Sequence, residues 1–212
     1  YLKIPVGHVE AGIRTWNRMN PFPEEINRQL TTRITDFHFA PTEWAKNNLL
    51  GEGIDPKTVF VTGNTVIDAL LMIVDPGYRF NEPSISGIDF TNRRVLLLTS
   101  HRRENFGEPM REVFSACRYI VEHNPDVELV YPVHPNPNVL KAAEEILAGV
   151  PRVHCIKPME YRPFVQLMNK SYLILTDSGG VQEEAPTLGK PVLVLRTTTE
   201  RPEAVEAGTA RL

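Results

Sequence analysis

Short apolar runs alternate along the chain with longer segments in which apolar residues recur at helical spacing. The runs predict strands over Ile4–Val9, His38–Ala40, Val59–Thr62, Val95–Thr99, Glu128–Val133, Arg152–Ile156, Tyr172–Thr176 and Pro191–Leu195. The periodic segments predict helices over Glu24–Ile34, Thr42–Leu50, Val66–Ile73, Pro109–His123, Val139–Leu147, Pro163–Asn169 and Val181–Leu188. Strands that are apolar on both faces and alternate with helices indicate a parallel sheet covered on both sides, in an α/β, doubly wound fold.

The strand pattern breaks after Thr62, and a second α/β series begins soon afterwards. We therefore expect residues 1–63 to be part of a first Rossmann-like domain and residues 64–212 to form a second, truncated at its end. The first part is too short for a whole domain, and the sequence opens on Tyr1 instead of Met, so we expect a fragment. Residues 75–92 are polar and rich in Pro and Gly, which predicts a surface excursion.

Composition and charge argue against several classes of protein. A net charge of -3, with basic residues in short clusters, argues against nucleic-acid binding. The apolar stretches are too short to cross a bilayer, and no signal-like segment is present, so we expect a cytoplasmic protein without membrane contact. Cys117 and Cys155 are expected to be reduced core thiols. Neither a metal-ligand spacing nor a glycine fingerprint for NAD or a P-loop is present.

Polar or charged residues directly follow five of the predicted strands. These loops begin at Glu10, Ser100, His134, Asp177 and Arg196. Ligands of open parallel sheets bind beyond the carboxyl ends of the strands. Five such loops on one rim therefore predict a binding crevice.

The stretch from Asp177 to Gly180 joins a buried strand to a helix. Ser178, Gly179 and Gly180 would present backbone N–H groups and the positive end of the helix dipole, which suits a phosphate. Glu184, one turn further on, could accept hydrogen bonds from a ribose diol. Phosphate and ribose sites side by side predict a nucleotide. The alternative is an ordinary turn with Ser178 as the helix N-cap.

Three potential cations, His101, Arg102 and Arg103, follow another buried strand and could neutralise a diphosphate. The alternative is a solvated basic turn paired with neighbouring glutamates. His134 lies at a further strand end, where a polar contact with a ligand is credible.

Glu10 and Glu24 lie at the two ends of an unusually long loop. Two carboxylates brought to one cleft can divide the roles of acid and base if their surroundings separate their pKa values. The alternative is that Glu24 merely complements the N-terminus of the helix that it begins.

Several motifs resemble those of the non-hydrolysing UDP-N-acetylglucosamine 2-epimerases. They are His8 to Thr15, Pro21 to Glu25 with Asn27-Arg28, Thr62 to Thr65 with Ile67 to Leu70, His101 to Gly107, Asp177 to Pro186 and Thr199 to Ala204. The resemblance covers essentially the whole chain in order. It implies two Rossmann-like domains in the arrangement called GT-B, and interconversion of UDP-N-acetylglucosamine and UDP-N-acetylmannosamine without a cofactor. The implied chemistry eliminates UDP to leave an enzyme-held glycal and then adds UDP back.

The resemblance also implies roles for single residues. Glu10 and Glu24 would be the acid and base, and His101 would assist the departing diphosphate. UDP would be bound by Ser178, Gly179 and Gly180 at the phosphates, Glu184 at the ribose, Phe164 at the uracil, and Arg201. Arg102 and His134 match positions where bacterial members hold a second UDP-N-acetylglucosamine as activator.

The family usually forms homodimers that supply precursors of cell-surface polysaccharide. Its N-terminal half, which carries a further catalytic Asp, has no counterpart in these 212 residues. We therefore expect the chain alone to bind UDP weakly and to turn over little or nothing. Three alternatives remain open: a GT-B glycosyltransferase, a hydrolysing epimerase that releases N-acetylmannosamine, and a UDP-sugar-binding module without catalysis.

Overall fold

The computed structural model describes residues 2–212, which form two compact units. The first unit contains the described residues up to Ala69 together with residues 198–203, and the second contains residues 70–197 and 204–212. The sequence predicted a boundary after residue 63. The division between the two units lies later, after Ala69, inside helix α3 (Thr65–Ile73). That residues 198–203 belong with the first unit was not indicated by the sequence pattern.

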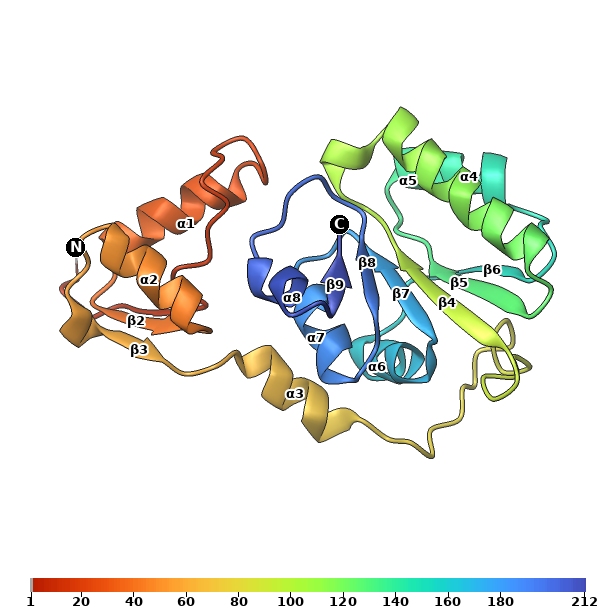
Figure 1. Cartoon of the computed structure of the whole chain (residues 1–212), viewed down its shortest axis with the longest axis horizontal. Helices are drawn as coiled ribbons and strands as arrows, with labels where there is room; N and C mark the ends of the chain where they lie inside the picture. Colours follow the sequence, from red (N-terminus) through yellow and green to blue (C-terminus); the bar gives the residue numbers. More distant parts are fainter. Residues whose placement is uncertain (1) are drawn as a thin grey trace. The chain divides into compact units, whose positions relative to one another are not determined.

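The first unit is a small parallel sheet with two α-helices (Figure 1). Its strands, in the order β1-β2-β3, are β1 (Gly7–Val9), β2 (Phe37–Ala40) and β3 (Val59–Val61). The helices are α1 (Glu24–Arg33) and α2 (Glu43–Gly51), and a 3-10 turn, η1 (Pro56–Thr58), precedes β3. Helix α2 begins where expected because the Thr42 hydroxyl accepts the N–H of Ala45 at 3.1 Å.

The second unit contains a six-stranded sheet in which every neighbouring pair is parallel. Its strands are β4 (Arg94–Thr99), β5 (Val127–Pro132), β6 (Val153–Ile156), β7 (Leu173–Thr176), β8 (Val192–Val194) and β9 (Ala210–Arg211), in the order β6-β5-β4-β7-β8-β9. The strand order reverses between β4 and β7, as in a Rossmann-type sheet. The predicted doubly wound α/β class is confirmed.

Helices cover both faces of this sheet because successive residues of its central strand point to opposite sides. Val95 and Leu97 enter a core with α6 (Tyr161–Lys170) and α7 (Val181–Thr187). Leu96 and Leu98 enter a second core with α4 (Glu108–His123) and α5 (Pro137–Leu147). The remaining helical elements are η2 (Arg103–Asn105) and α8 (Pro202–Glu206). The short α8 and β9 were not predicted.

The expectation of a surface excursion over residues 75–92 holds only in part. Most of these residues are exposed and belong to no helix or strand, but Ile85 is fully buried and Phe80, Ile88 and Phe90 pack against the same core. The expectation for Cys155 is wrong. Cys117 is buried on α4 as expected, whereas Cys155 is exposed because it lies on β6, an edge strand. Among the helices of residues 2–212, none is both long and apolar enough to cross a membrane.

Candidate functional site

A cavity of about 330 Å³ opens where β4, β5 and β7 end in the second unit. Four residues that the sequence singled out, His101, His134, Phe164 and Ser178, line it together. The rest of the lining is mainly apolar: Thr99, Ser100, Pro132, Pro135, Pro158, Met159 and Val181. A concave, mostly apolar cavity with a few convergent polar groups at a topological switch point is the expected form of a ligand site.

His101, which lines this cavity, is held by two neighbours. Its Nδ1 lies 3.2 Å from Oδ1 of Asp177, and its ring stacks on that of His134 with centroids 5.3 Å apart. Burial lowers the pKa of His101, and the negative charge of Asp177 opposes this effect. In the free site the His101 imidazole is therefore mainly neutral. An anionic ligand bound beside it would favour protonation of this ring.

Asp177 is the functional-site residue that the sequence reasoning missed. It is fully buried at the end of β7, and its Oδ2 accepts the backbone N–H groups of His101 at 2.8 Å and Arg102 at 2.9 Å. These bonds tie the turn after β4 to the end of β7. Its position directly after a buried strand was the available signal, because that same position identified its neighbours.

The turn from Ser178 to Gly180 connects β7 to α7. The N–H of Ser178 is donated to Thr176 Oγ1 at 3.0 Å, and α7 begins after Gly180. Ser178 is therefore not the N-cap of α7, so that part of the structural alternative is wrong, although the segment is a turn. Of the three predicted phosphate-binding residues, Ser178 lines the cavity, while Gly179 and Gly180 lead from it into the helix.

Glu184 follows on α7 and is almost completely buried. The hydroxyl of Tyr161 on α6 donates a hydrogen bond to its Oε1 at 2.7 Å. Burial raises the pKa of Glu184, whereas the hydrogen bond from Tyr161 acts in the opposite direction. One carboxylate oxygen is thus fixed by Tyr161, and Oε2 keeps lone pairs that could accept from a diol.

The two predicted acid–base carboxylates belong to the first unit. Glu10 directly follows β1, has an unusual backbone φ of 63° and accepts a hydrogen bond from Asn64 Nδ2 at 2.7 Å. Glu24 is exposed at the start of α1. Arg201, predicted to contact the nucleotide, also belongs to this unit and pairs with Glu200 at 2.8 Å.

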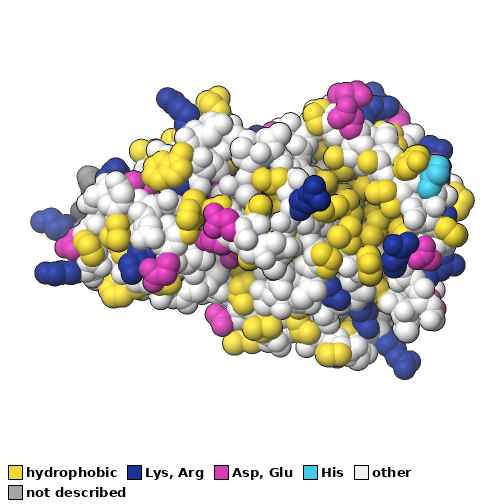
Figure 2. Space-filling model, in the orientation of Figure 1, with side chains coloured by type: hydrophobic (Ala, Val, Ile, Leu, Met, Phe, Trp, Pro, Cys, Tyr) yellow, Lys and Arg dark blue, Asp and Glu magenta, His cyan; other side chains and the backbone are white. Residues whose placement is uncertain are grey.

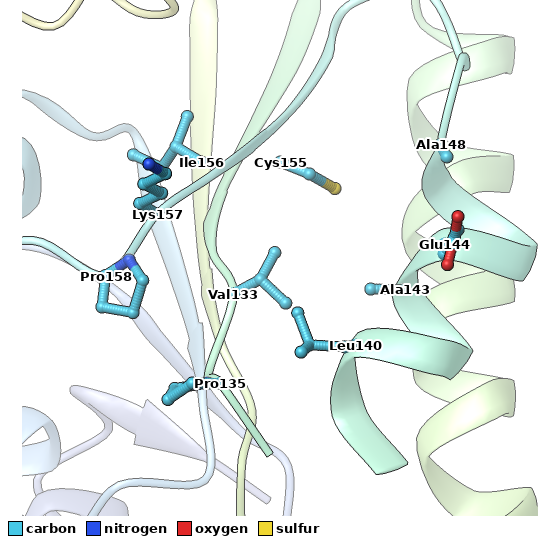
Figure 3. Close-up of a pocket in the computed structure, with 10 residues that line it drawn as sticks. All are labelled: Val133, Pro135, Leu140, Ala143, Glu144, Ala148, Cys155, Ile156, Lys157 and Pro158. Atoms are coloured by element: carbon cyan, nitrogen blue, oxygen red, sulfur yellow. The ribbon is translucent and has the colours of Figure 1, made fainter. Parts of the chain in front are cut away.

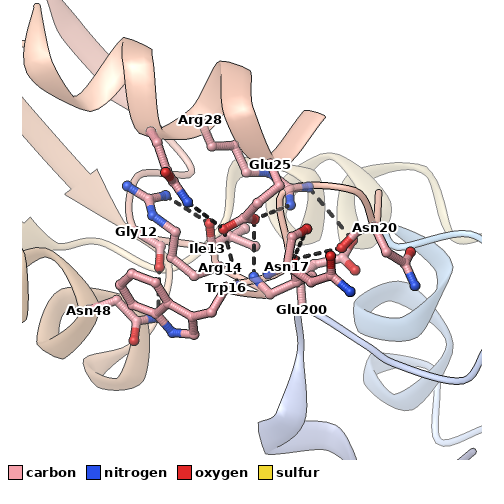
Figure 4. A network of polar contacts seen from close by, with 12 residues as sticks. Gly12, Ile13, Arg14, Trp16, Asn17, Asn20, Glu25, Arg28, Asn48 and Glu200 are labelled. Carbon is pink, nitrogen blue, oxygen red and sulfur yellow. Dashed lines mark hydrogen bonds and ion pairs between the residues drawn. The ribbon is translucent and has the colours of Figure 1, made fainter. Parts of the chain in front are cut away.

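A buried carboxylate beside Glu24 organises the loop that separates it from Glu10 (Figure 4). Glu25 accepts the backbone N–H groups of Thr15 at 3.0 Å and Trp16 at 3.2 Å. Arg28 lies 3.7 Å from Glu25 and 3.7 Å from Glu200, so it links α1 to residues 198–203. The conformation of the long loop is therefore fixed from one end of α1.

A fully buried arginine fixes the other side of this loop. Arg14 pairs with Glu52 at 2.7 Å and donates to the Thr32 hydroxyl at 2.8 Å and to the carbonyl of Ile13 at 2.8 Å. These contacts connect the loop to both helices of the first unit. Neither Arg14 nor Glu25 was predicted to have a role.

A second, larger cavity of about 590 Å³ lies between β6 and α5. Figure 3 shows Val133 and Leu140 at its walls, with the Cys155 side chain pointing toward α5. In Figure 2, hydrophobic side chains gather in a hollow on the viewed face of the second unit. Of the predicted site residues, none lines this second cavity, although Pro135 and Pro158 line both cavities.

No cluster of three or more His, Cys, Asp or Glu residues within residues 2–212 is arranged to hold a metal ion. The chemistry available around the first cavity is that of hydrogen-bond donors, the His101 ring with its carboxylate partner Asp177, and the aromatic ring of Phe164. This set suits the binding and departure of a phosphorylated aromatic compound.

Comparison with known proteins places these features in a family. Residues 1–212 match the family model described as UDP-N-acetylglucosamine 2-epimerase. A Bacillus subtilis UDP-N-acetylglucosamine 2-epimerase is 57% identical over the whole chain, which covers 55% of that relative. A crystal structure of UDP-GlcNAc 2-epimerase from Neisseria meningitidis bound to UDP-GlcNAc is 52% identical with a TM-score of 0.95, and the chain covers 58% of it.

A structure of S. aureus MnaA with UDP is 48% identical with a TM-score of 0.94, over 99% of this chain and 56% of that one. The chain thus spans a little more than half the length of these relatives. Their likeness agrees with two Rossmann-like units of which the first is incomplete. On the match along its entire length, this chain belongs to the UDP-N-acetylglucosamine 2-epimerase family.

Proposed function

We propose that the chain supplies the UDP-binding unit and two acid–base carboxylates of an enzyme that epimerises UDP-N-acetylglucosamine at C2. The observation that carries the proposal is the cavity in which His101, His134, Phe164 and Ser178 meet at the switch point of the second sheet. The N. meningitidis relative was solved with UDP-GlcNAc, and the S. aureus relative with UDP.

Each part of the nucleotide finds a suitable group in the second unit. Phe164 offers a ring against which a uracil can stack. The Ser178 hydroxyl and the backbone N–H groups of Gly179 and Gly180 offer donors to the phosphates. Glu184 accepts from the ribose with the oxygen that Tyr161 leaves open. The His101 ring donates to the diphosphate as charge develops on it during departure.

Glu10 and Glu24 perform the proton transfers at C2. Removal of the C2 proton by one carboxylate accompanies cleavage of the bond from C1 to the β-phosphate oxygen, whose electron pair leaves with UDP. Return of a proton to the opposite face, with re-addition of UDP, gives UDP-N-acetylmannosamine. Two carboxylates are needed because one group reaches only one face of the sugar.

The finer features of the family belong to the same proposal. Arg102 and His134 contribute to a site for a second UDP-N-acetylglucosamine that activates the enzyme, and the working form is a homodimer. The position of His134 in the cavity lining, stacked on His101, supports the activator site. The homodimer is supported by the family resemblance alone.

The test has a binding arm and a reaction arm. Calorimetry should show UDP binding to this chain, abolished or at least tenfold weaker in Ser178→Trp, which fills the cavity with a bulky ring. Incubation of UDP-N-acetylglucosamine in deuterated water, with the chain extended to the length of its relatives, should place deuterium at C2 by NMR. Glu10→Gln and Glu24→Gln should keep UDP affinity within about threefold while losing deuterium incorporation.

Three results would contradict the proposal. A chain that fails to bind UDP, or an extended protein that transfers the sugar without exchange at C2, would exclude epimerisation by this site. Release of free N-acetylmannosamine in place of its UDP derivative would show a hydrolysing enzyme instead.

A further inference from the structure

We infer that Asp177 is a positioning residue for His101: its carboxylate holds the proton on Nδ1 of the ring and so leaves Nε2 as the nitrogen that meets the ligand. The inference deepens the proposed function and rests on it only for the identity of that ligand, a nucleoside diphosphate. The pairing of the two side chains stands on the geometry alone.

The first observation is that one oxygen of Asp177 is saturated by donors from the turn after β4. Oδ2 accepts the N–H groups of His101 and Arg102 at 2.8 and 2.9 Å, and the Ser100 hydroxyl and Asn105 amide each at 3.3 Å. Rotation of the carboxylate would break several of these bonds at once. Its orientation is therefore fixed by the backbone that carries His101.

The other carboxylate oxygen of Asp177, Oδ1, lies beside the His101 ring and has no donor of its own within residues 2–212. Oδ1 is buried, accepts no hydrogen bond from the described part of the chain, and lies 3.2 Å from Nδ1 of His101. A buried carboxylate oxygen without a donor is costly, so a proton on Nδ1 directed at it is strongly favoured. The neutral ring then carries its proton on Nδ1, and Nε2 is free to gain one.

The third observation concerns the neighbouring ring. Nδ1 of His134 accepts the N–H of Asn136 at 3.2 Å, so the neutral His134 carries its proton on Nε2. The two rings are stacked at 15°, and two imidazolium cations in that arrangement would repel one another. The carboxylate of Asp177 beside Nδ1 stabilises a positive charge on His101, so His101 is the ring that gains the charge.

The charged and titratable groups facing His101 agree with this assignment. Burial lowers the pKa of His101 most, Asp177 and Glu104 raise it, and His134 and Arg102 lower it. The free ring is therefore mostly neutral near pH 7. An arriving diphosphate adds negative charge at Nε2, and the ring takes one proton from solvent to become an imidazolium between two anions.

This charge state suits the departure of UDP. When the C1–O bond breaks, its electron pair moves to the β-phosphate oxygen, and the Nε2–H of His101 donates to that oxygen. The Nδ1–H stays on the ring, and Asp177 remains a carboxylate throughout. Asp177 touches no substrate atom in this scheme and acts only through the histidine.

The experiment measures the tautomer and the pKa of the His101 ring directly. The chain is labelled with ¹⁵N-histidine, the tautomer is determined by two-bond proton–nitrogen NMR, and His101→Gln assigns the signals. In the parent chain we expect the proton on Nδ1. In Asp177→Asn, the amide oxygen must face the backbone donors, so the amide NH₂ faces Nδ1 and the ring switches to the Nε2–H tautomer with a lower pKa.

UDP binding supplies a second readout. The parent chain should take up protons as UDP binds, so its affinity strengthens as the pH falls from about 8 to about 6. Asp177→Asn should lose this proton uptake and bind UDP about tenfold more weakly at the lower pH, as expected for loss of a charge-assisted hydrogen bond. A variant that only loosened the fold would weaken binding equally at both pH values.

Glu128→Gln is the matched control, because Glu128 also pairs with a histidine on a strand of the same sheet. Its Oε2 lies 2.8 Å from Nε2 of His154, and neither residue lines the cavity around His101. The substitution removes the carboxylate beside His154 and should leave the tautomer and titration of His101 unaltered. A change in His101 in this control as well would point to a general effect on the fold and overturn the inference.

The outcomes separate this inference from the proposed function. A neutral His101 with its proton on Nε2 in the parent chain overturns the inference, and this result needs no folded variant. So does an Asp177→Asn chain with the parent tautomer and pKa. If the proton lies on Nδ1 and UDP does not bind, the positioning role stands while the proposed function fails.

Discussion

Tyr161 on α6 and Glu184 on α7 are joined by a hydrogen bond of 2.7 Å that points the buried carboxylate of Glu184 in one direction. Burial raises the pKa of Glu184 above its ordinary value, so the folded chain binds this proton more tightly than the unfolded chain does. Stability from this group is therefore present below its ordinary pKa and is lost as the pH rises through the folded pKa. At neutral pH the ionised carboxylate opposes folding.

We predict that Glu184→Gln stabilises the chain at pH 7 and has little effect near pH 4. The amide keeps an acceptor for Tyr161 but has no charge to bury. Urea unfolding followed by circular dichroism at several pH values measures the difference. Tyr161→Phe is the matched variant and should act in the opposite direction, because it removes the hydrogen bond that favours the ionised form. A difference between Glu184→Gln and the parent that did not grow with pH would contradict the prediction.

Arg14→Ala should destabilise the first unit by about 3 kcal/mol, because it removes one partner of a largely buried ion pair and leaves the charge of Glu52 without it. Both tryptophans, Trp16 and Trp44, lie in this unit, so their fluorescence reports its unfolding selectively. The control is Lys46→Ala, which removes a more exposed pair with Glu43 and should cost less than about 0.5 kcal/mol. Equal losses in the two variants would show that the buried network is not what holds the loop.

Ile85→Ala should destabilise the second unit by about 3 kcal/mol, as expected for truncating a fully buried aliphatic side chain. Circular dichroism measures this loss, while tryptophan fluorescence should show the first unit unchanged. Met72→Ala, at a side chain that is 83% exposed, should have almost no effect. A loss at Ile85 as small as that at Met72 would mean that residues 75–92 contribute little to the core.

The two thiols should differ in reactivity. Cys155 is exposed, whereas Cys117 is buried and burial raises its pKa to about 12. At pH 8 a disulfide reagent should modify Cys155 in the folded chain and Cys117 only after denaturant is added. Burial also raises the pKa of Cys155, so its reaction should be slower than that of free cysteine. Cys155→Ser should remove the reaction of the folded state, and rapid modification of two thiols without denaturant would contradict the assignment.

The sequence predicted elements, and residues that meet around one cavity, wherever the relevant physics is local. His101 and Ser178 were identified because polar residues that directly follow buried strands lie at the rim of a parallel sheet. Asp177 has the same position, but its contacts depend on N–H groups in the turn after β4, far away in the chain. No local pattern carries that information.

Other differences have similar causes. Residues 75–92 are polar overall, so their composition does not indicate that a single apolar side chain such as Ile85 is buried. That burial depends on core residues from distant parts of the chain. Strand β9 is two residues long and gains its identity only by pairing with β8. The apolar residues around Cys155 in the sequence predict a core position. Its exposure instead follows from the place of β6 at the edge of the sheet.

The backbone of Glu10 has a φ of 63°, in the left-handed region where a side chain costs of order 1 kcal/mol relative to glycine. Replacement by glycine would relieve that cost and delete the carboxylate to which the proposed reaction assigns a proton transfer. A thermostability screen run without an activity assay would thus reward the loss of this group. Heat resistance and turnover need to be selected together at this position.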